Sequence, residues 1–332
     1  MKLFRTLAEA ERGVALSGEP SGVCIGNFDG VHLGHQALIG RLREECAVLG
    51  AKPSVLTFDP HPARVLAPER APRLLSTVEQ RLAWMSAAGV EQALVLPFTP
   101  EFAAMTPEEF VEGVLVRAAG ARVVVVGANF RFGRKQSGDA ARLAELGERH
   151  GFITRVVEGV YARGRLVSST EIRKLVESGN VRMAGRLLGR CFAVEGVVVS
   201  GAGIGSRQTV PTLNLSTEAE VLPGAGVYVT RATDIGSGAQ WASVTNAGVR
   251  PTFDGEQFVI ETFVLDGLRG EAPRRLRVEF LFRLRDERRF ADAASLKAQI
   301  LRDVVRARRY HAWIGSGSGA RRGGRAILTR YP

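Results

Sequence analysis

The sequence predicts two domains: a doubly wound α/β domain built on a parallel sheet, and then an antiparallel β domain that ends in a long helix. In the first half, short apolar runs alternate with amphipathic stretches as far as residue 157, which is typical of βαβ units. The run 122–127 contains four consecutive valines, as in a strand buried on both faces of a parallel sheet. From Cys191 onward, short valine-rich runs separated by Gly, Pro or Asp indicate an antiparallel sandwich or barrel.

Length and composition allow two globular cores. The chain has 332 residues, 45% of them hydrophobic, and a mean hydropathy of +0.02, so two domains are expected. It contains no run of about eighteen apolar residues that could cross a membrane, and its N-terminus soon meets charged residues, unlike a signal peptide. Cys24, Cys46 and Cys191 lack the spacing of a metal site, and we expect reduced thiols in a cytoplasmic protein with no membrane partner.

The positive charge is concentrated near the C-terminus. Residues 269–332 contain 17 Lys and Arg against 6 Asp and Glu, which equals the net charge of the whole chain, +11. Such a segment either binds nucleic acid or forms a solvated basic helix and tail. Because the tail does not interleave aromatic with basic residues, as stacking on bases requires, we expect no nucleic-acid partner.

A glycine-rich loop follows the first strand predicted for the α/β domain. Residues 26–35 lie between the apolar run 23–25 and an amphipathic stretch over 32–49. A strand, a glycine-rich turn and a helix start are suited to phosphate, because the backbone can approach closely and its N–H groups point at the anion. His32 and His35 share one face of the helix start, so both imidazoles can donate to phosphates. Alternatively, one histidine only caps the helix.

The remaining elements of the first half repeat the α/β pattern. Further strands are predicted at residues 53–58, 92–97, 122–127 and 153–157, and helical stretches at 77–89, 107–119 and 143–151. In a doubly wound sheet, the loops after the strands gather at one edge, where ligands bind. Residues 168–173, Ser-Ser-Thr-Glu-Ile-Arg, place hydroxyls at a helix start, which suits an N-cap and equally a phosphate site.

The second half is expected to be mostly strand. Its predicted strands cover residues 192–200, 226–233, 241–245, 258–265 and 276–284, and a helix follows over 292–310. The domain boundary is expected near residues 179–188, which predicts domains at 1–184 and 185–314. The basic remainder, 315–332, is rich in Gly, Ser and Arg near its start and is expected to be flexible.

Nine short motifs follow one another in a specific order. They occupy residues 26–36, 57–62, 127–133, 168–173, 188–190, 211–214, 226–228, 246–253 and 260–262. Together they resemble the prokaryotic bifunctional riboflavin kinase/FMN adenylyltransferase (FAD synthetase) family over about residues 21–303. The resemblance implies a Rossmann-like, nucleotidyltransferase-type α/β domain followed by a six-stranded antiparallel β-barrel riboflavin kinase domain. It also implies ATP, riboflavin and FMN as substrates and a divalent cation, normally Mg²⁺.

For the first half, the resemblance implies transfer of AMP from ATP to FMN, which yields FAD and pyrophosphate. His32 and His35 would hold the ATP phosphates and stabilise charge during the transfer, which depends on positioning and electrostatics. Ser169, Thr170 and Arg173 would hold the β- and γ-phosphates. The other binding residues that the resemblance implies are Gly26, Phe28, Asp29, Gly30, Gly34, Asp59, His61 and Asn129.

For the second half, the resemblance implies phosphorylation of riboflavin to FMN. Glu261 would be the base for the 5′-hydroxyl, although a carboxylate within a strand is more often an exposed charge. Thr212 and Asn214 would bind Mg²⁺ through oxygen atoms, where local sequence alone favours a simple turn. The chain departs from the family at residues 205–210, Gly-Ser-Arg-Gln-Thr-Val, which shifts the basic residue to Arg207; this side chain is still expected to reach a phosphate.

Three other functions remain open from the sequence. The altered loop allows an FMN adenylyltransferase joined to a degenerate flavin-binding barrel. The first domain alone would fit a nucleotidyltransferase with another substrate, which the second domain argues against. The basic C-terminus allows a nucleic-acid-binding protein. The sequence does not predict an oligomeric state.

Overall fold

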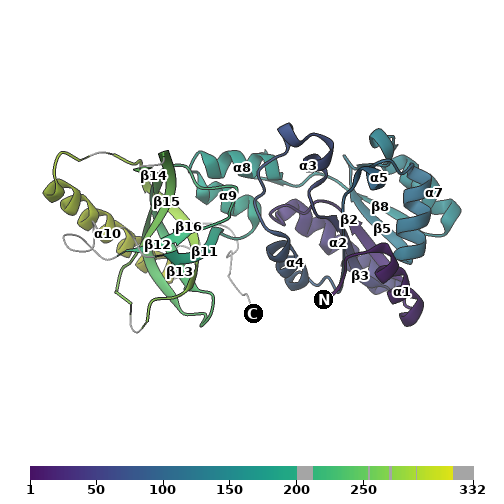
Figure 1. Cartoon of the computed structure of the whole chain (residues 1–332). Helices are drawn as coiled ribbons and strands as arrows, with labels where there is room; N and C mark the ends of the chain where they lie inside the picture. The colour runs from purple at the N-terminus through teal and green to yellow at the C-terminus, as the bar shows by residue number, and fades with distance from the viewer. Residues whose placement is uncertain (200–211, 253–254, 269–270, 289, 317–332) are drawn as a thin grey trace. The chain divides into compact units, whose positions relative to one another are not determined.

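The computed structural model describes residues 1–199, 212–252, 255–268, 271–288 and 290–316 (Figure 1). The chain divides into two compact units, Met1–Ser169 and Thr170–Pro332, and each is described by itself. The predicted boundary at residues 184 and 185 falls inside a helix, α9 (Val181–Leu188). Among the described residues, no helix is long and apolar enough to cross a membrane.

The first unit is built on a six-stranded sheet with the order β1-β4-β3-β2-β5-β8, in which every neighbouring pair is parallel. The strands are β1 (Lys2–Phe4), β2 (Ser21–Ile25), β3 (Lys52–Phe58), β4 (Gln92–Leu96), β5 (Ala121–Gly127) and β8 (Ile153–Val157). The predicted parallel sheet is confirmed, and the predicted strand ends lie within one or two residues of the observed ones. The edge strand β1 was not predicted.

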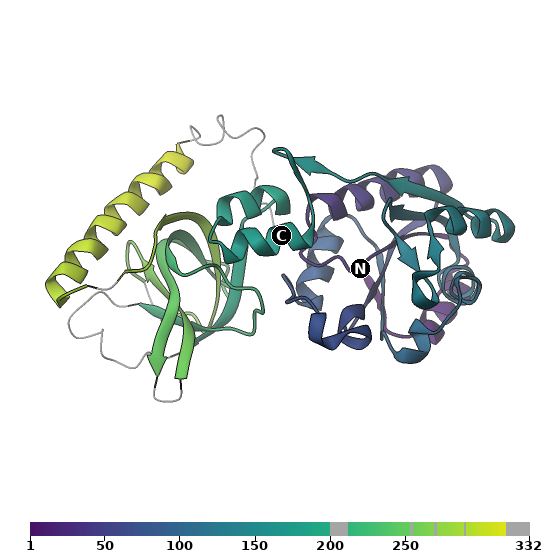
Figure 2. The ribbon, with the colours of Figure 1, turned by 90° about the horizontal axis from the view of Figure 1, so that it is seen from above.

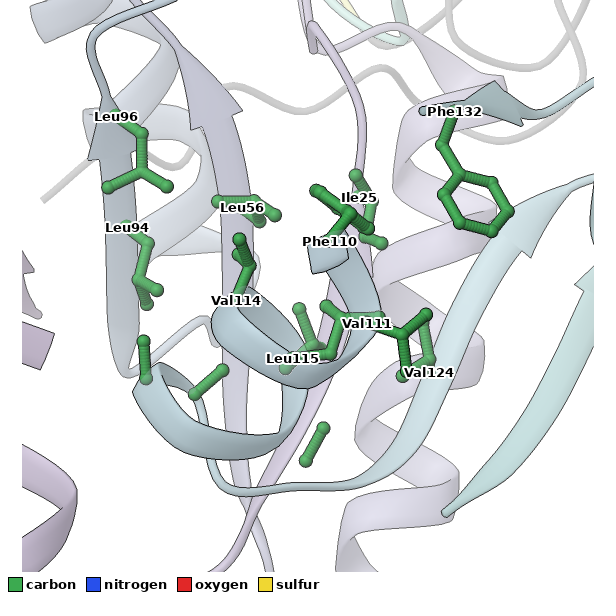
Figure 3. Close-up of a cluster of buried hydrophobic side chains, with 14 of the residues drawn as sticks. Ile25, Leu56, Leu94, Leu96, Phe110, Val111, Val114, Leu115, Val124 and Phe132 are labelled. Atoms are coloured by element: carbon green, nitrogen blue, oxygen red, sulfur yellow. The ribbon is translucent and has the colours of Figure 1, made fainter. Parts of the chain in front are cut away.

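Helices cover both faces of this sheet. On one face, Phe110, Val114 and Leu115 belong to a buried cluster with strand residues such as Leu56 and Val124 (Figure 3). That face carries α1 (Leu7–Ser17), α6 (Pro107–Phe110), the π-helix η2 (Val111–Ala118) and α7 (Ala140–His150). The other face carries α2 (Leu33–Leu49) and α4 (Val78–Ala87). Full burial of one such apolar side chain contributes about 1.5–3 kcal/mol, so these two layers hold the sheet and the loops at its edge.

Short elements fill the connections of the first unit. They are α3 (Pro62–Leu66), η1 (Pro68–Arg70), α5 (Pro100–Ala103), η3 (Arg134–Gln136), the pair β6 (Arg131–Phe132) and β7 (Gly138–Asp139), and the pair β9 (Tyr161–Ala162) and β10 (Arg165–Leu166).

The second unit combines a helical pair with a closed barrel (Figures 1 and 2). The helices α8 (Ser169–Glu177) and α9 precede the barrel, and α10 (Ala293–Gly315) follows it. The barrel order is β11-β12-β15-β14-β13-β16, and all its pairs are antiparallel. The strands are β11 (Phe192–Val199), β12 (Leu213–Ser216), β13 (Gly226–Asp234), β14 (Gln240–Thr252), β15 (Gly255–Val264) and β16 (Arg275–Arg285). The predicted antiparallel barrel is therefore confirmed, and the alternative of a sandwich is wrong. The helix α10 ends five residues later than the predicted helix over 292–310.

The two faces of the barrel wall differ in chemistry. On the outer face, Val227, Val229 and Val244 pack with Ala307 of α10. On the inner face, hydroxyls form a hydrogen-bonded chain: Thr230 to Ser243 at 2.8 Å and to Thr245 at 2.7 Å, and Thr245 to Thr262 at 2.9 Å. All four of these side chains are fully buried. Side chains alternate between the two faces along a strand. A residue an even number of positions from one of these valines or hydroxyl residues on the same strand therefore lies on the same face as that residue.

Candidate functional sites

The loop between β2 and α2 is a constrained structure. Three of its residues have positive φ angles: Phe28 (50°), Gly30 (77°) and Val31 (36°). Only glycine adopts such angles without strain, yet Phe28 and Val31 are both fully buried. Contacts from outside the loop must therefore stabilise its conformation.

One set of such contacts reaches the loop from residues 75 and 76. The carboxylate of Asp29, only 3% exposed, accepts hydrogen bonds from the Leu75 N–H at 2.9 Å and the Ser76 hydroxyl at 3.3 Å. Ser76 Oγ in turn accepts the Gly30 N–H at 2.9 Å. Asp29 thus helps to hold the loop in its conformation through these contacts.

His32, at the end of the loop, and His35, in the first turn of α2, are in contact. The His32 Nδ1 atom accepts the backbone N–H of His35 at 3.3 Å and so caps α2. The two rings stack with centroids 3.7 Å apart and planes inclined by 13°. Gly34 keeps this space open, since a Cβ atom there would lie 3.1 Å from the His32 ring. His32 thus caps the helix, as one of the two alternatives from the sequence has it, and its ring also stacks on that of His35.

The capping bond also determines a tautomer. A neutral imidazole has one donor and one acceptor nitrogen, and Nδ1 of His32 is the acceptor. The proton of a neutral His32 ring is therefore on Nε2, which can donate to an anion at the helix N-terminus.

Other predicted residues lie at the same edge of the sheet. β2 is flanked by β3 and β5, and because these strands are parallel their following loops gather at one edge. Asp59 and Asn129, both exposed, follow β3 and β5, and Gly26 follows β2. His61 caps α3 by accepting the Ala63 N–H at Nδ1, 3.1 Å away.

The Ser-Ser-Thr motif is split by the division into units. The Ser169 hydroxyl donates to the Asp29 carbonyl at 2.9 Å. This bond connects the first residue of α8 to the loop between β2 and α2, residues 26–32, which we call the histidine loop. Thr170 and Arg173 belong to the second unit, where Arg173 Nη2 donates to Thr170 Oγ1 at 3.3 Å. The structure thus brings Ser169 to the predicted site and describes the other two within α8.

In the barrel, three polar residues lie side by side. Glu261 of β15 pairs with Asn214 of β12 on one side and with Asn246 of β14 on the other. Directly paired residues share a face and have Cβ atoms about 4.5–5.5 Å apart. This row is on the outer face, because Asn246 is also paired with Val227. Glu261 is half-buried, so it is neither a fully exposed charge nor part of the barrel interior.

The donor atoms near this row suit a hard cation. Thr212 is exposed and directly precedes β12, and Asn214 is half-buried within it. A hydroxyl and an amide oxygen beside a carboxylate are ligands of the type Mg²⁺ prefers, so the residues fit the implied metal. Arg207 and the altered segment 205–210 lie outside the described residues.

Two residues of these sites were missed in the sequence. Arg81 is 2% exposed and donates from Nη1 to the Asn27 carbonyl at 2.7 Å. Its signal was a charge at an apolar position of α4, since Val78, Leu82 and Met85 occupy the same face of the helix. Asn246 could be placed beside Glu261 only once the strand register was known.

A parallel sheet with a histidine pair at a helix N-terminus, joined to a barrel with a carboxylate and amide row, defines a two-unit, nucleotide-using transferase. The sequence model of the FAD synthetase family matches residues 16–171, and that of riboflavin kinase matches residues 188–311. The chain belongs to the bifunctional riboflavin kinase/FMN adenylyltransferase family.

Relatives cover most of the chain. The bifunctional riboflavin kinase/FMN adenylyltransferase of Pseudomonas fluorescens is 38% identical over 86% of this chain and 91% of its own length. That of Escherichia coli K12 is 35% identical over 93% of this chain and 98% of its own. A crystal structure described as a macrolide-efflux protein from Streptococcus pneumoniae has a TM-score of 0.80 and 28% identity, and covers 88% of this chain and 95% of that one.

Proposed function

We propose that the chain makes FMN and then FAD, with one half responsible for each step. Residues 185–314 phosphorylate riboflavin with ATP, and residues 1–184 transfer AMP from ATP to the resulting FMN. The observation that carries this proposal is the succession of both family matches within one chain, each inside its proposed range. Residues 315–332 form a basic tail outside both domains. We also propose a cytoplasmic location, in keeping with the free thiols of all three cysteines.

Adenylylation is proposed at the histidine loop. A phosphate oxygen of FMN bonds to the α-phosphorus of ATP as the bond from that phosphorus to pyrophosphate breaks. His32, donating from Nε2, and the stacked His35 hold the phosphate oxygens as charge develops on them. Ser169, Thr170 and Arg173 hold the β- and γ-phosphates, which leave as pyrophosphate. Gly26, Phe28, Asp29, Gly30, Gly34, Asp59, His61 and Asn129 shape the loops at this edge.

Riboflavin phosphorylation is proposed at the Glu261 row. The 5′-hydroxyl oxygen of riboflavin bonds to the γ-phosphorus of ATP, the bond from that phosphorus to ADP breaks, and the hydroxyl proton passes to the Glu261 carboxylate. Asn214 and Asn246 flank Glu261 on the neighbouring strands. Mg²⁺, held by Thr212 and Asn214, would neutralise charge on the ATP phosphates, and Arg207 would contact them as well.

The first experiment incubates the purified chain with riboflavin, ATP and Mg²⁺ and separates the flavins by chromatography. FMN should form first and FAD after it, and EDTA should stop both steps. Titration with Mg²⁺, Mn²⁺ or Ca²⁺ after EDTA tests the metal. The control is a chain that carries both His32→Ala and Glu261→Ala and is purified in the same way. It should form neither FMN nor FAD, which excludes contaminating enzymes as the source of either product. Conversion of added FMN with riboflavin untouched would disprove the kinase, and no product from either flavin would disprove both activities.

A further inference from the structure

Arg81 is the largest fully buried side chain of the molecule's described part, and it is charged. It lies in α4 at 2% exposure beside Leu82 and Met85, which pack in the apolar cluster on that face of the sheet. A buried cation is costly unless it is paired and hydrogen-bonded. A residue of this kind, placed under a predicted ligand site, requires an explanation beyond packing.

The guanidinium holds the histidine loop next to one of its strained residues. Arg81 Nη1 donates to the Asn27 carbonyl at 2.7 Å, and the Thr57 hydroxyl donates to the same oxygen at 3.4 Å. This carbonyl belongs to the peptide that leads into Phe28, whose φ angle is 50°. A strained conformation persists only when its surroundings determine it, and Arg81 is the one charged side chain among the hydrogen bonds described here to Asn27.

The charge of Arg81 faces carboxylates from three segments. Burial lowers the pKa of Arg81, and the negative charges of Asp29, Asp59 and Glu79 oppose that effect. Arginine nevertheless stays protonated at neutral pH. Asp29 and Asp59 adjoin the edge where ATP phosphates are proposed, and without a cation beneath them they would repel a triphosphate.

We infer that Arg81 is a positioning residue for the nucleotide: a fixed cation that holds the Asn27 peptide and offsets the carboxylates beside it, so that the loop accepts a polyphosphate. The inference rests on the proposed adenylylation site. It assigns Arg81 no contact with the reacting atoms and no part in the kinase reaction.

The test compares Arg81→Lys, Arg81→Gln and Arg81→Met in the full chain. Lysine keeps the charge and a donor, glutamine keeps only a donor, and methionine keeps neither. The KM for ATP in FAD formation should rise by about 10- to 100-fold in the Gln and Met variants, the range for loss of a charged hydrogen bond, and by less than about fivefold in the Lys variant. FMN formation should be unchanged in all three. Arg149→Met, which removes an exposed arginine paired with Glu145, is the matched control and should leave both activities unchanged.

A pH profile of the Lys variant decides the question even if the neutral variants fail to fold. The surroundings that lower the pKa of Arg81 will also lower that of a lysine there, so the lysine should lose its charge at a lower pH than an exposed lysine does. The KM for ATP should then rise with pH in the Lys variant. In the wild type, the KM for ATP should change much less over the same pH range. Equal ATP KM values in folded Lys, Gln and Met variants, or parallel pH profiles of wild type and Lys variant, would overturn the inference. Failure of the wild type to adenylylate FMN would instead contradict the proposed function.

Discussion

At the scale of single residues, the Nδ1 atom of His32 is occupied by the N–H of His35, three residues further along. The capping bond orients the ring and leaves the proton on the opposite nitrogen. A substitution at this position therefore removes a helix cap as well as a phosphate donor. Any test of the chemistry has to separate these two effects.

We predict that His32→Ala abolishes FAD formation from FMN, with a loss of about 10²–10³-fold or more, the usual cost of removing one group that stabilises developing charge. His32→Asn should be equally inactive although asparagine is a good N-cap. Both variants should still make FMN from riboflavin, as measured by chromatography. His150→Ala, at an exposed position at the end of α7, is the control. Activity restored by asparagine would mean that His32 acts only as a cap.

Glu261 permits the reciprocal prediction. Glu261→Ala and Glu261→Gln should reduce FMN formation by about 10²–10⁴-fold, the range for loss of a general base, because neither side chain can take up the hydroxyl proton. FAD formation from supplied FMN should continue at the wild-type rate. The control is Glu271→Gln at an exposed position of the same unit. Loss of both activities in a folded Glu261 variant would contradict two separate sites.

At the scale of elements, α10 is attached to the barrel by polar contacts as well as apolar ones. The carboxylate of Asp303, 2% exposed, accepts two hydrogen bonds. One comes from Arg285 Nε of β16 at 2.9 Å and the other from Gln299 Nε2 at 2.8 Å. Removal of one partner leaves the other buried without its counter-charge. This ion pair, together with the apolar packing of Ala307, attaches the long helix to the barrel.

We expect Asp303→Ala to lower the free energy of unfolding by about 3–5 kcal/mol, as for other buried pairs that lose one partner. Urea denaturation followed by circular dichroism measures this. Asp266→Ala removes a carboxylate that pairs with Arg308 of the same helix, with side chains 81% and 56% exposed, and should cost less than about 1 kcal/mol. Equal effects of the two substitutions would show that Asp303 does not attach the helix.

Helices and strands were predicted correctly where a contiguous stretch of the sequence specifies them. Buried parallel strands such as 122–127 were recognised because they are continuous apolar runs. The short strands β1 and β12 were not, because three or four residues carry too little pattern. Closure of the barrel depends on pairing between distant strands, which the alternation of one strand does not specify.

At the scale of the whole molecule, the two proposed steps share FMN, the product of one and the substrate of the other. We predict that a mixture of His32→Ala and Glu261→Ala chains converts riboflavin to FAD, because FMN released by the first chain can diffuse to the second. The double variant alone should form neither product, and chromatography over time should show FMN before FAD in the mixture. A mixture that stops at FMN would contradict a freely exchanged intermediate.

The candidate sites were predictable only in part, because contiguous motifs can be recognised in the sequence and contacts between distant segments cannot. His32, His35 and Glu261 belong to contiguous motifs and could be named from the sequence. Arg81 acts on Asn27 from 54 positions away, and Asn246 reaches Glu261 through strand register. No local pattern contains such relations; they exist only after the chain has folded.

The hydroxyl chain inside the barrel has a consequence for how the molecule tolerates change. Thr230, Ser243, Thr245 and Thr262 satisfy one another, so valine at one threonine leaves a buried hydroxyl without its bond, whereas valine at all three threonines together with alanine at Ser243 removes the demand. Single substitutions should be harmful and the combined set nearly neutral, which is strong epistasis. Lineages that diverge here should exchange these positions as a group, through few viable intermediates.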